Sequence, residues 1–146
     1  KHSRGFSLIK EYMGRDFPIP INGADYVYMS QVLQAHGITK GIYAHRRAKP
    51  YNMGTLYWQL NDCWPGASWS SIDYYGKWKA LHYKVRNAFK PLIVSHEFLD
   101  SNLQIAVISD LKDSFYGEVE VSCFPFKGDS LLKKWTKKMK IPLQNN

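Results

Sequence analysis

The sequence predicts an α/β part followed by an all-β part, and two observations carry this prediction. Up to about Pro91, apolar residues recur at spacings of three and four, which is typical of helices with one buried face. Beyond Leu92, apolar and polar residues alternate, which is typical of half-buried antiparallel strands. We therefore expect a domain boundary near Leu92, with residues 1–91 and 92–146 in different domains.

In the first part we expect a helix, a strand and a second helix, preceded by a short helical turn over Ser7–Met13. The first helix runs from Ala24 to about Arg46, because its apolar residues form one stripe: Tyr28, Val32, Ala35, Ile38 and Ile42. The short apolar run Met53–Trp58 favours a strand buried on both faces. The second helix is closed by Pro91, and its stripe consists of Trp78, Leu81, His82, Val85 and Phe89.

In the second part we expect three or four strands of a β-sandwich. Two alternating runs carry this expectation: Leu103, Ile105 and Val107 in one, and Val119, Val121 and Cys123 in the other. Turn-rich connections follow at Ser109–Ser114 and Lys127–Ser130. An immunoglobulin-like sandwich needs about seven strands in about 100 residues. With three or four strands, we expect an incomplete sandwich.

Composition excludes some classes of protein without identifying a partner. A chain that is 45% hydrophobic and 15% aromatic is not disordered, and no apolar run is long enough to span a bilayer. The formal net charge of +8 would attract nucleic acid or an anionic surface. The lysines that crowd around Trp135 favour a solvated edge strand over such a binding site: Lys133, Lys134, Lys137, Lys138 and Lys140. We expect neither a nucleic-acid nor a membrane partner.

Candidate binding residues lie where the predicted strand ends, in the segment Gly54–Trp64 (GTLYWQLNDCW). Trp58 at the strand end can form an apolar floor under a sugar ring, and Trp64 can add a second wall. Asn61 and Asp62 can hydrogen-bond sugar hydroxyls. In the alternative interpretation, both tryptophans are core residues and Asp62 only caps a turn.

This segment and the one after it, Pro65–Pro91 (PGASWSSIDYYGKWKALHYKVRNAFKP), resemble the end of the catalytic domain in β-mannosidases of glycoside hydrolase family 2. The resemblance spans roughly residues 24–110. It implies the last strand and helices of a (β/α)8 barrel over residues 1–91, and the N-terminal part of an immunoglobulin-like β-sandwich over residues 92–146. It places Trp58 against the sugar at the cleavage point.

The resemblance also implies that this chain is a fragment. The whole enzyme would remove terminal β-linked mannose from oligosaccharides with retention, through two glutamates on earlier barrel strands. The four glutamates of this chain do not follow buried strands in the family's catalytic motifs: Glu11, Glu97, Glu118 and Glu120. We therefore assign no catalytic residue here and expect the fragment alone to be inactive. An improvised pair of Asp62 and Asp73 is the weaker alternative.

Several further expectations complete the hypothesis. No metal site is expected at His82, because no second His or carboxylate stands beside it at a metal-ligand spacing. The resemblance implies that no metal or organic cofactor is required. The loop aromatics either line an outer sugar pocket or pin the loop to the second helix: Trp69, Tyr74 and Tyr75. For the parent enzyme, a secreted, periplasmic or lysosomal location is expected. The alternatives left open are a non-catalytic carbohydrate-binding module, a sister β-galactosidase or β-glucuronidase activity, and a basic nucleic-acid-binding protein.

Overall fold

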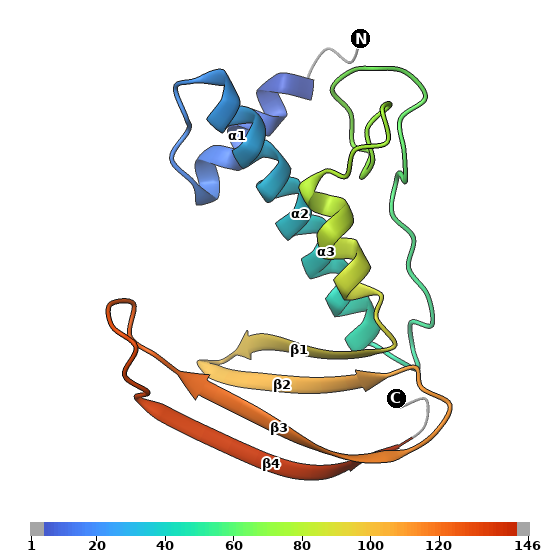
Figure 1. Cartoon of the computed structure of the whole chain (residues 1–146), viewed down its shortest axis with the longest axis vertical. Helices are drawn as coiled ribbons and strands as arrows, with labels where there is room; N and C mark the ends of the chain where they lie inside the picture. The colour runs from blue at the N-terminus through green and yellow to red at the C-terminus, as the bar shows by residue number, and fades with distance from the viewer. Residues whose placement is uncertain (1–4, 143–146) are drawn as a thin grey trace. The chain divides into compact units, whose positions relative to one another are not determined.

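The structure, a computed structural model, describes residues 5–142. The chain divides into two compact units, residues 1–90 and 91–146. The described helices lie in the first unit and the described strands in the second (Figure 1). Within residues 5–142, no helix combines the length and the apolar content that crossing a membrane requires.

The first unit contains three helices: α1 (Gly5–Asp16), α2 (Gly23–Arg47) and α3 (Ala80–Ala88). The helix α1 is longer than the turn that the sequence predicted, and an exposed ion pair between Arg15 and Glu11, one turn apart (2.5 Å), adds modestly to its last turns. Asn22 caps α2 by accepting a hydrogen bond from the backbone N–H of Asp25 (2.9 Å). The two helices predicted from the apolar stripes are confirmed as α2 and α3, with small shifts of their ends.

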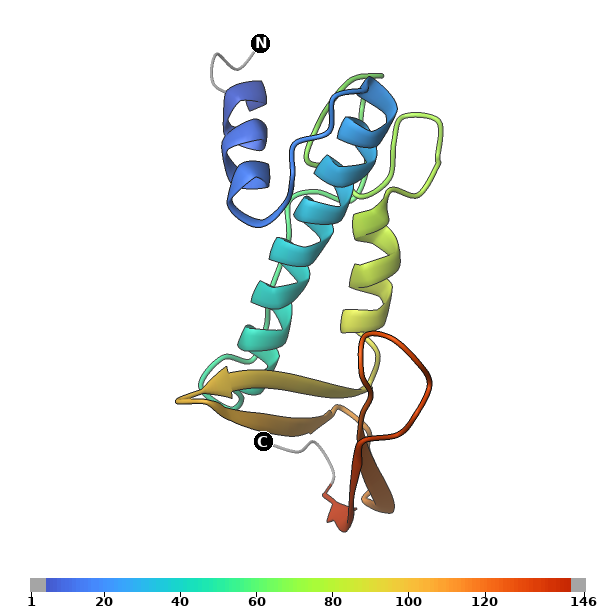
Figure 2. The same cartoon turned by 90° about the vertical axis from the view of Figure 1, so that its left-hand side faces the viewer.

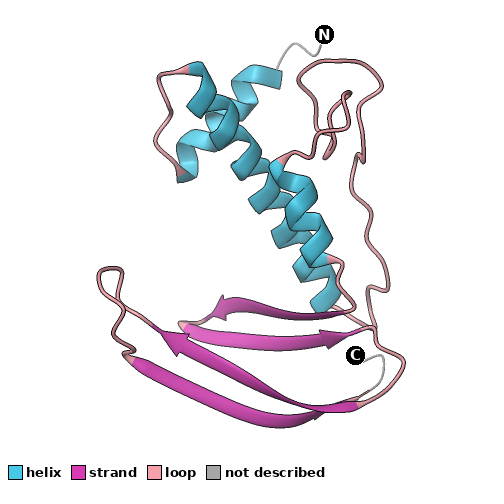
Figure 3. Cartoon of the chain, in the orientation of Figure 1, coloured by secondary structure: helices cyan, strands magenta, loops and turns pink. Residues whose placement is uncertain are grey.

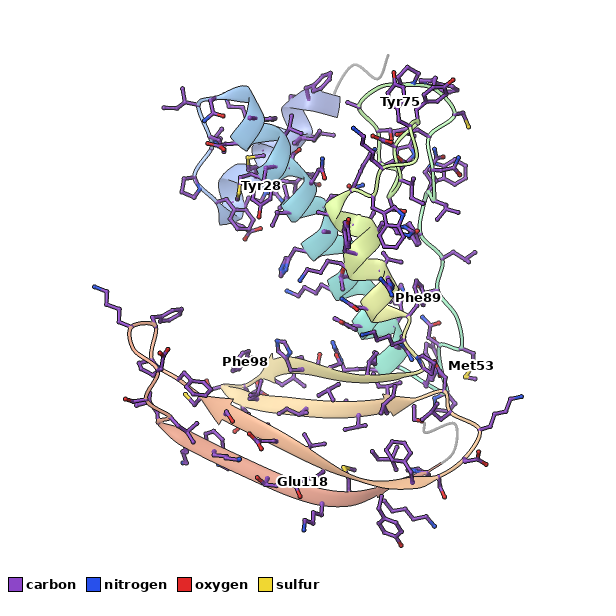
Figure 4. All side chains as sticks on the ribbon, viewed as in Figure 1. Tyr28, Met53, Tyr75, Phe89, Phe98 and Glu118 are labelled. Carbon is purple, nitrogen blue, oxygen red and sulfur yellow. The ribbon has the colours of Figure 1, made fainter. Side chains whose placement is uncertain are left out.

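The core of the first unit lies between α2 and α3, which run side by side in the same direction (Figures 1 and 2). It consists of Ala35, Ile42, Leu81, Val85 and Ala88. Since α3 has only 9 residues against 25 in α2, it covers only part of the longer helix. Tyr28, which the stripe predicted to be buried, lies near the start of α2 and is exposed (Figure 4).

Side chains of α2 hold both ends of α3. Near its start, the backbone N–H of Ala80 donates to Oε1 of Gln31 (3.2 Å). At its end, Nη1 of Arg46 donates to the carbonyl oxygens of Ala88 (2.5 Å) and Lys90 (2.8 Å). The first N–H groups and the last carbonyls of a helix lack partners within the helix, so these contacts satisfy groups that would otherwise need water.

The predicted strand Met53–Trp58 does not form; instead the connection between α2 and α3 is irregular (Figure 3). Among residues 5–142, no backbone group hydrogen-bonds to the backbone of residues 55–58. The side chains nevertheless alternate as in a strand: Tyr57 packs against the core, whereas Leu56 is 98% exposed. The segment is extended but unpaired, because a strand requires a neighbour and the described residues supply none.

The second unit contains two antiparallel hairpins. The first pairs β1 (Leu92–Leu99) with β2 (Asn102–Ser109), and the second pairs β3 (Phe115–Cys123) with β4 (Lys133–Ile141). Asp100 and Ser101, with φ of 48° and 65°, form the first hairpin's two-residue turn, whose positive φ values suit the type I′ geometry. The alternating runs therefore form antiparallel strands as predicted, and the lysine run forms an exposed strand within a two-stranded sheet.

Candidate functional site

The candidate site begins where the unpaired segment first gains backbone partners. The backbone N–H of Ser71 donates to the carbonyl of Gln59 (2.9 Å), and that of Ile72 donates to Leu60 (2.8 Å). The N–H of Asp62 in turn donates to the carbonyl of Ile72 (3.1 Å). The chain after Trp58 therefore doubles back on itself, and its loop is anchored beside the start of α3. The Trp58–Gln59 peptide bond is cis.

The four predicted binding residues lie close together along this stretch but differ in exposure. Trp58 is 72% exposed and Trp64 is 74% exposed, so neither tryptophan is a core residue of this chain. Asn61 is exposed, and its side-chain amide donates to the carbonyl of Asp62 (3.3 Å). Asp62 is only 9% exposed. Two exposed tryptophans and an exposed amide therefore occur within seven residues of one buried carboxylate.

The carboxylate of Asp62 is held by a compact polar network. Its Oδ1 accepts a hydrogen bond from the hydroxyl of Ser68, and its Oδ2 accepts one from Nζ of Lys79 (3.1 Å). Burial raises the pKa of Asp62, but hydrogen bonds from Ser68, Ser70 and Lys79, with the Lys79 charge, outweigh burial and hold it below its usual value. Asp62 is therefore ionised at neutral pH.

A second network lies beside the first and joins the unpaired segment to α3. The hydroxyl of Ser71 bonds to the carbonyl of Leu60 (2.9 Å), to the hydroxyl of Tyr57 (2.9 Å) and to Nδ1 of His82 (3.0 Å). The His82 ring also packs on Trp78, with 4.4 Å between ring centroids. Ser71 is fully buried, so this serine–histidine pair is closed to substrate and serves packing.

The following turn is fixed by Asp73. Its Oδ1 accepts from the backbone N–H groups of Tyr75 (2.9 Å) and Lys77 (2.8 Å). Tyr75 packs edge-on against Tyr74, and both rings remain exposed (Figure 4). The carboxylates of Asp73 and Asp62 belong to separate networks, so the structure does not join them as a catalytic pair.

The glutamates are placed as surface groups. Glu118 and Glu120 lie on the exposed face of β3 and pair across the hairpin with Lys138 (3.9 Å) and Lys134 (2.8 Å). Hydrogen bonds from Lys134 and from Ser122 hold the pKa of Glu120 below its usual value. Cross-strand pairing of this kind occupies part of the lysine cluster. Among residues 5–142, no group of three His, Cys, Asp or Glu side chains could hold a metal ion.

Sequence reasoning missed the residues that support the site. Lys79 contacts Asp62 from 17 positions away, and Gln34 of α2 donates to the carbonyl of Trp69 (2.8 Å) across 35 positions. No local spacing predicts either contact, because both depend on how α2 and α3 pack. The serine-rich stretch Ser68–Ser71 was the one available signal, since short hydroxyl side chains often hydrogen-bond within a loop.

Comparison with known proteins identifies the relatives of this chain. No protein-family model matches it. It is 32% identical to β-mannosidase A of Emericella nidulans over 151 aligned positions, which cover 96% of this chain and 16% of that protein. It is also 46% identical to the β-mannosidase of Bos taurus over 76 residues, 47% of this chain. This chain is homologous to the β-mannosidases.

The structural relatives agree with this homology. The crystal structure of a β-D-mannosidase from Dictyoglomus thermophilum matches 98% of this chain with a TM-score of 0.84 and 31% identity. An exo-chitosanase from Amycolatopsis orientalis matches with a TM-score of 0.80 at 19% identity, which shows a shared fold alone. The chain covers 16% and 14% of the length of two fungal relatives, and 18% of the Dictyoglomus thermophilum chain.

Proposed function

We propose that this chain is part of a retaining β-mannosidase of glycoside hydrolase family 2, which removes terminal β-linked mannose from oligosaccharides. The observation that carries the proposal is the homology to β-mannosidases over nearly the whole chain, in sequence and in structure. The activity belongs to a longer protein, because the chain spans only a small share of the proteins that it matches.

We further propose that residues 1–91 form the C-terminal part of a (β/α)8 barrel and residues 92–146 the N-terminal part of an immunoglobulin-like sandwich. The direction of the chain supports the barrel: α2 and α3 run the same way, and the extended segment between them runs back in the opposite direction (Figure 1). Tyr57 faces the helices, whereas Leu56 and Trp58 face away from them. A barrel strand shows this alternation, with one set of side chains against the helices and the other inside the barrel.

In this arrangement Trp58 lies at the C-terminal end of the last barrel strand, where the active sites of such barrels are built. We propose that its exposed ring forms the floor under the sugar and that Trp64 forms a second wall. Asn61 would bond a sugar hydroxyl through its exposed amide. Asp62 would accept a further hydroxyl, because an ionised carboxylate offers about four acceptor positions and three are occupied by Ser68, Ser70 and Lys79.

The two carboxyl groups of the reaction would come from outside this chain. Retaining hydrolysis needs a nucleophile and an acid/base about 5 Å apart on either side of the glycosidic bond. Asp62 is ionised and bound to Lys79, so it is unsuited to donate a proton to the leaving group. The chain alone is therefore expected to bind mannosides without cleaving them. The reaction requires neither a metal nor an organic cofactor.

The test compares hydrolysis of chromogenic β-mannoside, β-galactoside and β-glucuronide by the full-length parent and by this chain. We expect the parent to prefer the β-mannoside and this chain to show no turnover. A parent that prefers β-galactoside or β-glucuronide would overturn the assigned sugar, and a parent that binds sugar without cleaving it would indicate a binding module. Turnover by the isolated chain that is lost in Trp58→Ala would refute the view that it lacks its catalytic acids.

A further inference from the structure

The least expected feature of the candidate site is the position of Lys79, whose ammonium group has three oxygen partners. Its Nζ lies 2.7 Å from Oγ of Ser70, 3.1 Å from Oδ2 of Asp62 and 3.3 Å from Oγ of Ser68. An ammonium group carries three N–H donors and no acceptor, so these oxygens match its hydrogen-bonding capacity. None of the sequence patterns assigned Lys79 a role.

These partners mark the two ends of one loop, Asp62–Ser70. Asp62 is its first residue, whereas Ser68 and Ser70 belong to its last turn. The backbone adds to the closure, because the N–H of Lys79 donates to the carbonyl of Ser71 (2.9 Å) just beyond the loop. Gln34 holds the same end through the carbonyl of Trp69. Between these anchors, residues 63–67 are exposed.

We propose that Lys79 is a positioning residue that closes the loop Asp62–Ser70 and thereby fixes where Trp64 and Trp69 present their rings. The part-buried ammonium group of Lys79 is the cation that joins the two ends, and it adds three hydrogen bonds to the direct contact between Ser68 and Asp62. The consequence for sugar contact rests on the function proposed above, since only there does Trp64 meet a ligand. The effect on the loop is independent of that function.

No neutral side chain can replace the contact of the Lys79 ammonium group with Asp62, Ser68 and Ser70. In Lys79→Met the aliphatic stem remains, but the Asp62 carboxylate stays buried without its cation and the serines lose their shared donor. Removing one partner of a buried ion pair costs far more than removing both, because the remaining charge is left uncompensated. The loop relieves this cost by moving the carboxylate toward water, which displaces Trp64.

The experiment follows the five indole N–H resonances of this chain by ¹H–¹⁵N NMR, assigned through single Trp→Phe variants. We expect Lys79→Met to shift or broaden the resonances of Trp64 and Trp69 and to leave that of Trp135, in the other unit, unchanged. Lys84→Met is the matched control, because Lys84 is an exposed lysine on α3. It should leave the resonances of Trp64 and Trp69 in place.

Unchanged Trp64 and Trp69 resonances in a folded Lys79→Met variant would overturn the proposal. If that variant does not fold, the double variant Asp62→Asn/Lys79→Met leaves no unpaired buried charge, and the same shifts are expected from it. Titration with mannobiose separates this proposal from the function. We expect Lys79→Met to weaken binding about tenfold, because the displaced Trp64 no longer contacts the sugar in the same way. If the wild-type chain shows no binding of mannobiose while Lys79→Met still shifts the Trp64 and Trp69 resonances, that result would contradict the proposed sugar site and support the proposed loop closure.

Discussion

Replacing Arg46 with methionine should destabilise the helical unit, because the Arg46 side chain holds the end of α3. Arg46 is 6% exposed, and its Nη1 supplies donors to the carbonyls of Ala88 and Lys90. A hydrogen bond to a charged group contributes about 1.5–3 kcal/mol. Ala88 is fully buried, so water cannot easily replace the lost donor there, whereas Lys90 is exposed and its carbonyl can be rehydrated. One bond is therefore lost in full and the other in part.

The expected loss is about 2–4 kcal/mol in the free energy of unfolding. For a unit of this size that corresponds to a fall of roughly 10–20 °C in the melting temperature. The methionine keeps the apolar stem, so the change tests the hydrogen bonds and not the packing. Circular dichroism at 222 nm reports the unfolding, because the described helices lie in this unit. The control is Lys40→Met, an exposed position on the same helix, where a change within about 0.5 kcal/mol is expected. Equal midpoints for the two variants would refute the reasoning.

Three further predictions concern the site and the turns. In the full-length parent, Trp58→Ala should lower kcat/KM for a β-mannoside at least tenfold, about 1.4 kcal/mol; an unchanged value would remove Trp58 from the site. Because the folded pKa of Asp62 is lowered, its stabilising contribution is complete above the unfolded pKa of about 3.9 and is lost as pH falls through the folded value. The stability difference between wild type and Asp62→Asn, measured by urea unfolding, should therefore shrink with acidification in that range, and a difference that grows would contradict the network. Ser101→Gly should raise the free energy of unfolding by about 0.5–1 kcal/mol, because φ at this residue is 65°; a lower free energy of unfolding would argue against the type I′ turn.

The helices and hairpins were predictable because their signals are local. The stripe over α2 needs only the spacing of residues such as Ala35 and Ile42, and the strands of the second unit need only alternation. The exposure of Tyr28 was not predictable, because it depends on α3 being shorter than α2. Periodicity identifies the apolar face of a helix but not how much of that face a neighbour covers.

The candidate site was predictable in part. The sequence placed Trp58, Asn61, Asp62 and Trp64 together as a candidate sugar site, and that role stays a prediction. The structure shows that both tryptophans are exposed and that Asp62 is buried. The side chains that hold the loop could not be found, because Lys79 and Gln34 approach it from other elements. The strand predicted over Met53–Trp58 did not form for a related reason: β propensity is local, but the hydrogen bonds of a strand belong to its neighbours.

The unpaired segment after α2 has a practical consequence for anyone who produces this chain. Within the part of the chain that the structure describes, the backbone groups of residues 55–58 have no backbone partner, and the neighbouring side chains of Leu56 and Trp58 are exposed. An uncovered edge of this kind is a template on which another extended chain can add. Aggregation should therefore increase with protein concentration, and a short extended peptide that pairs with this segment should reduce it by occupying the edge.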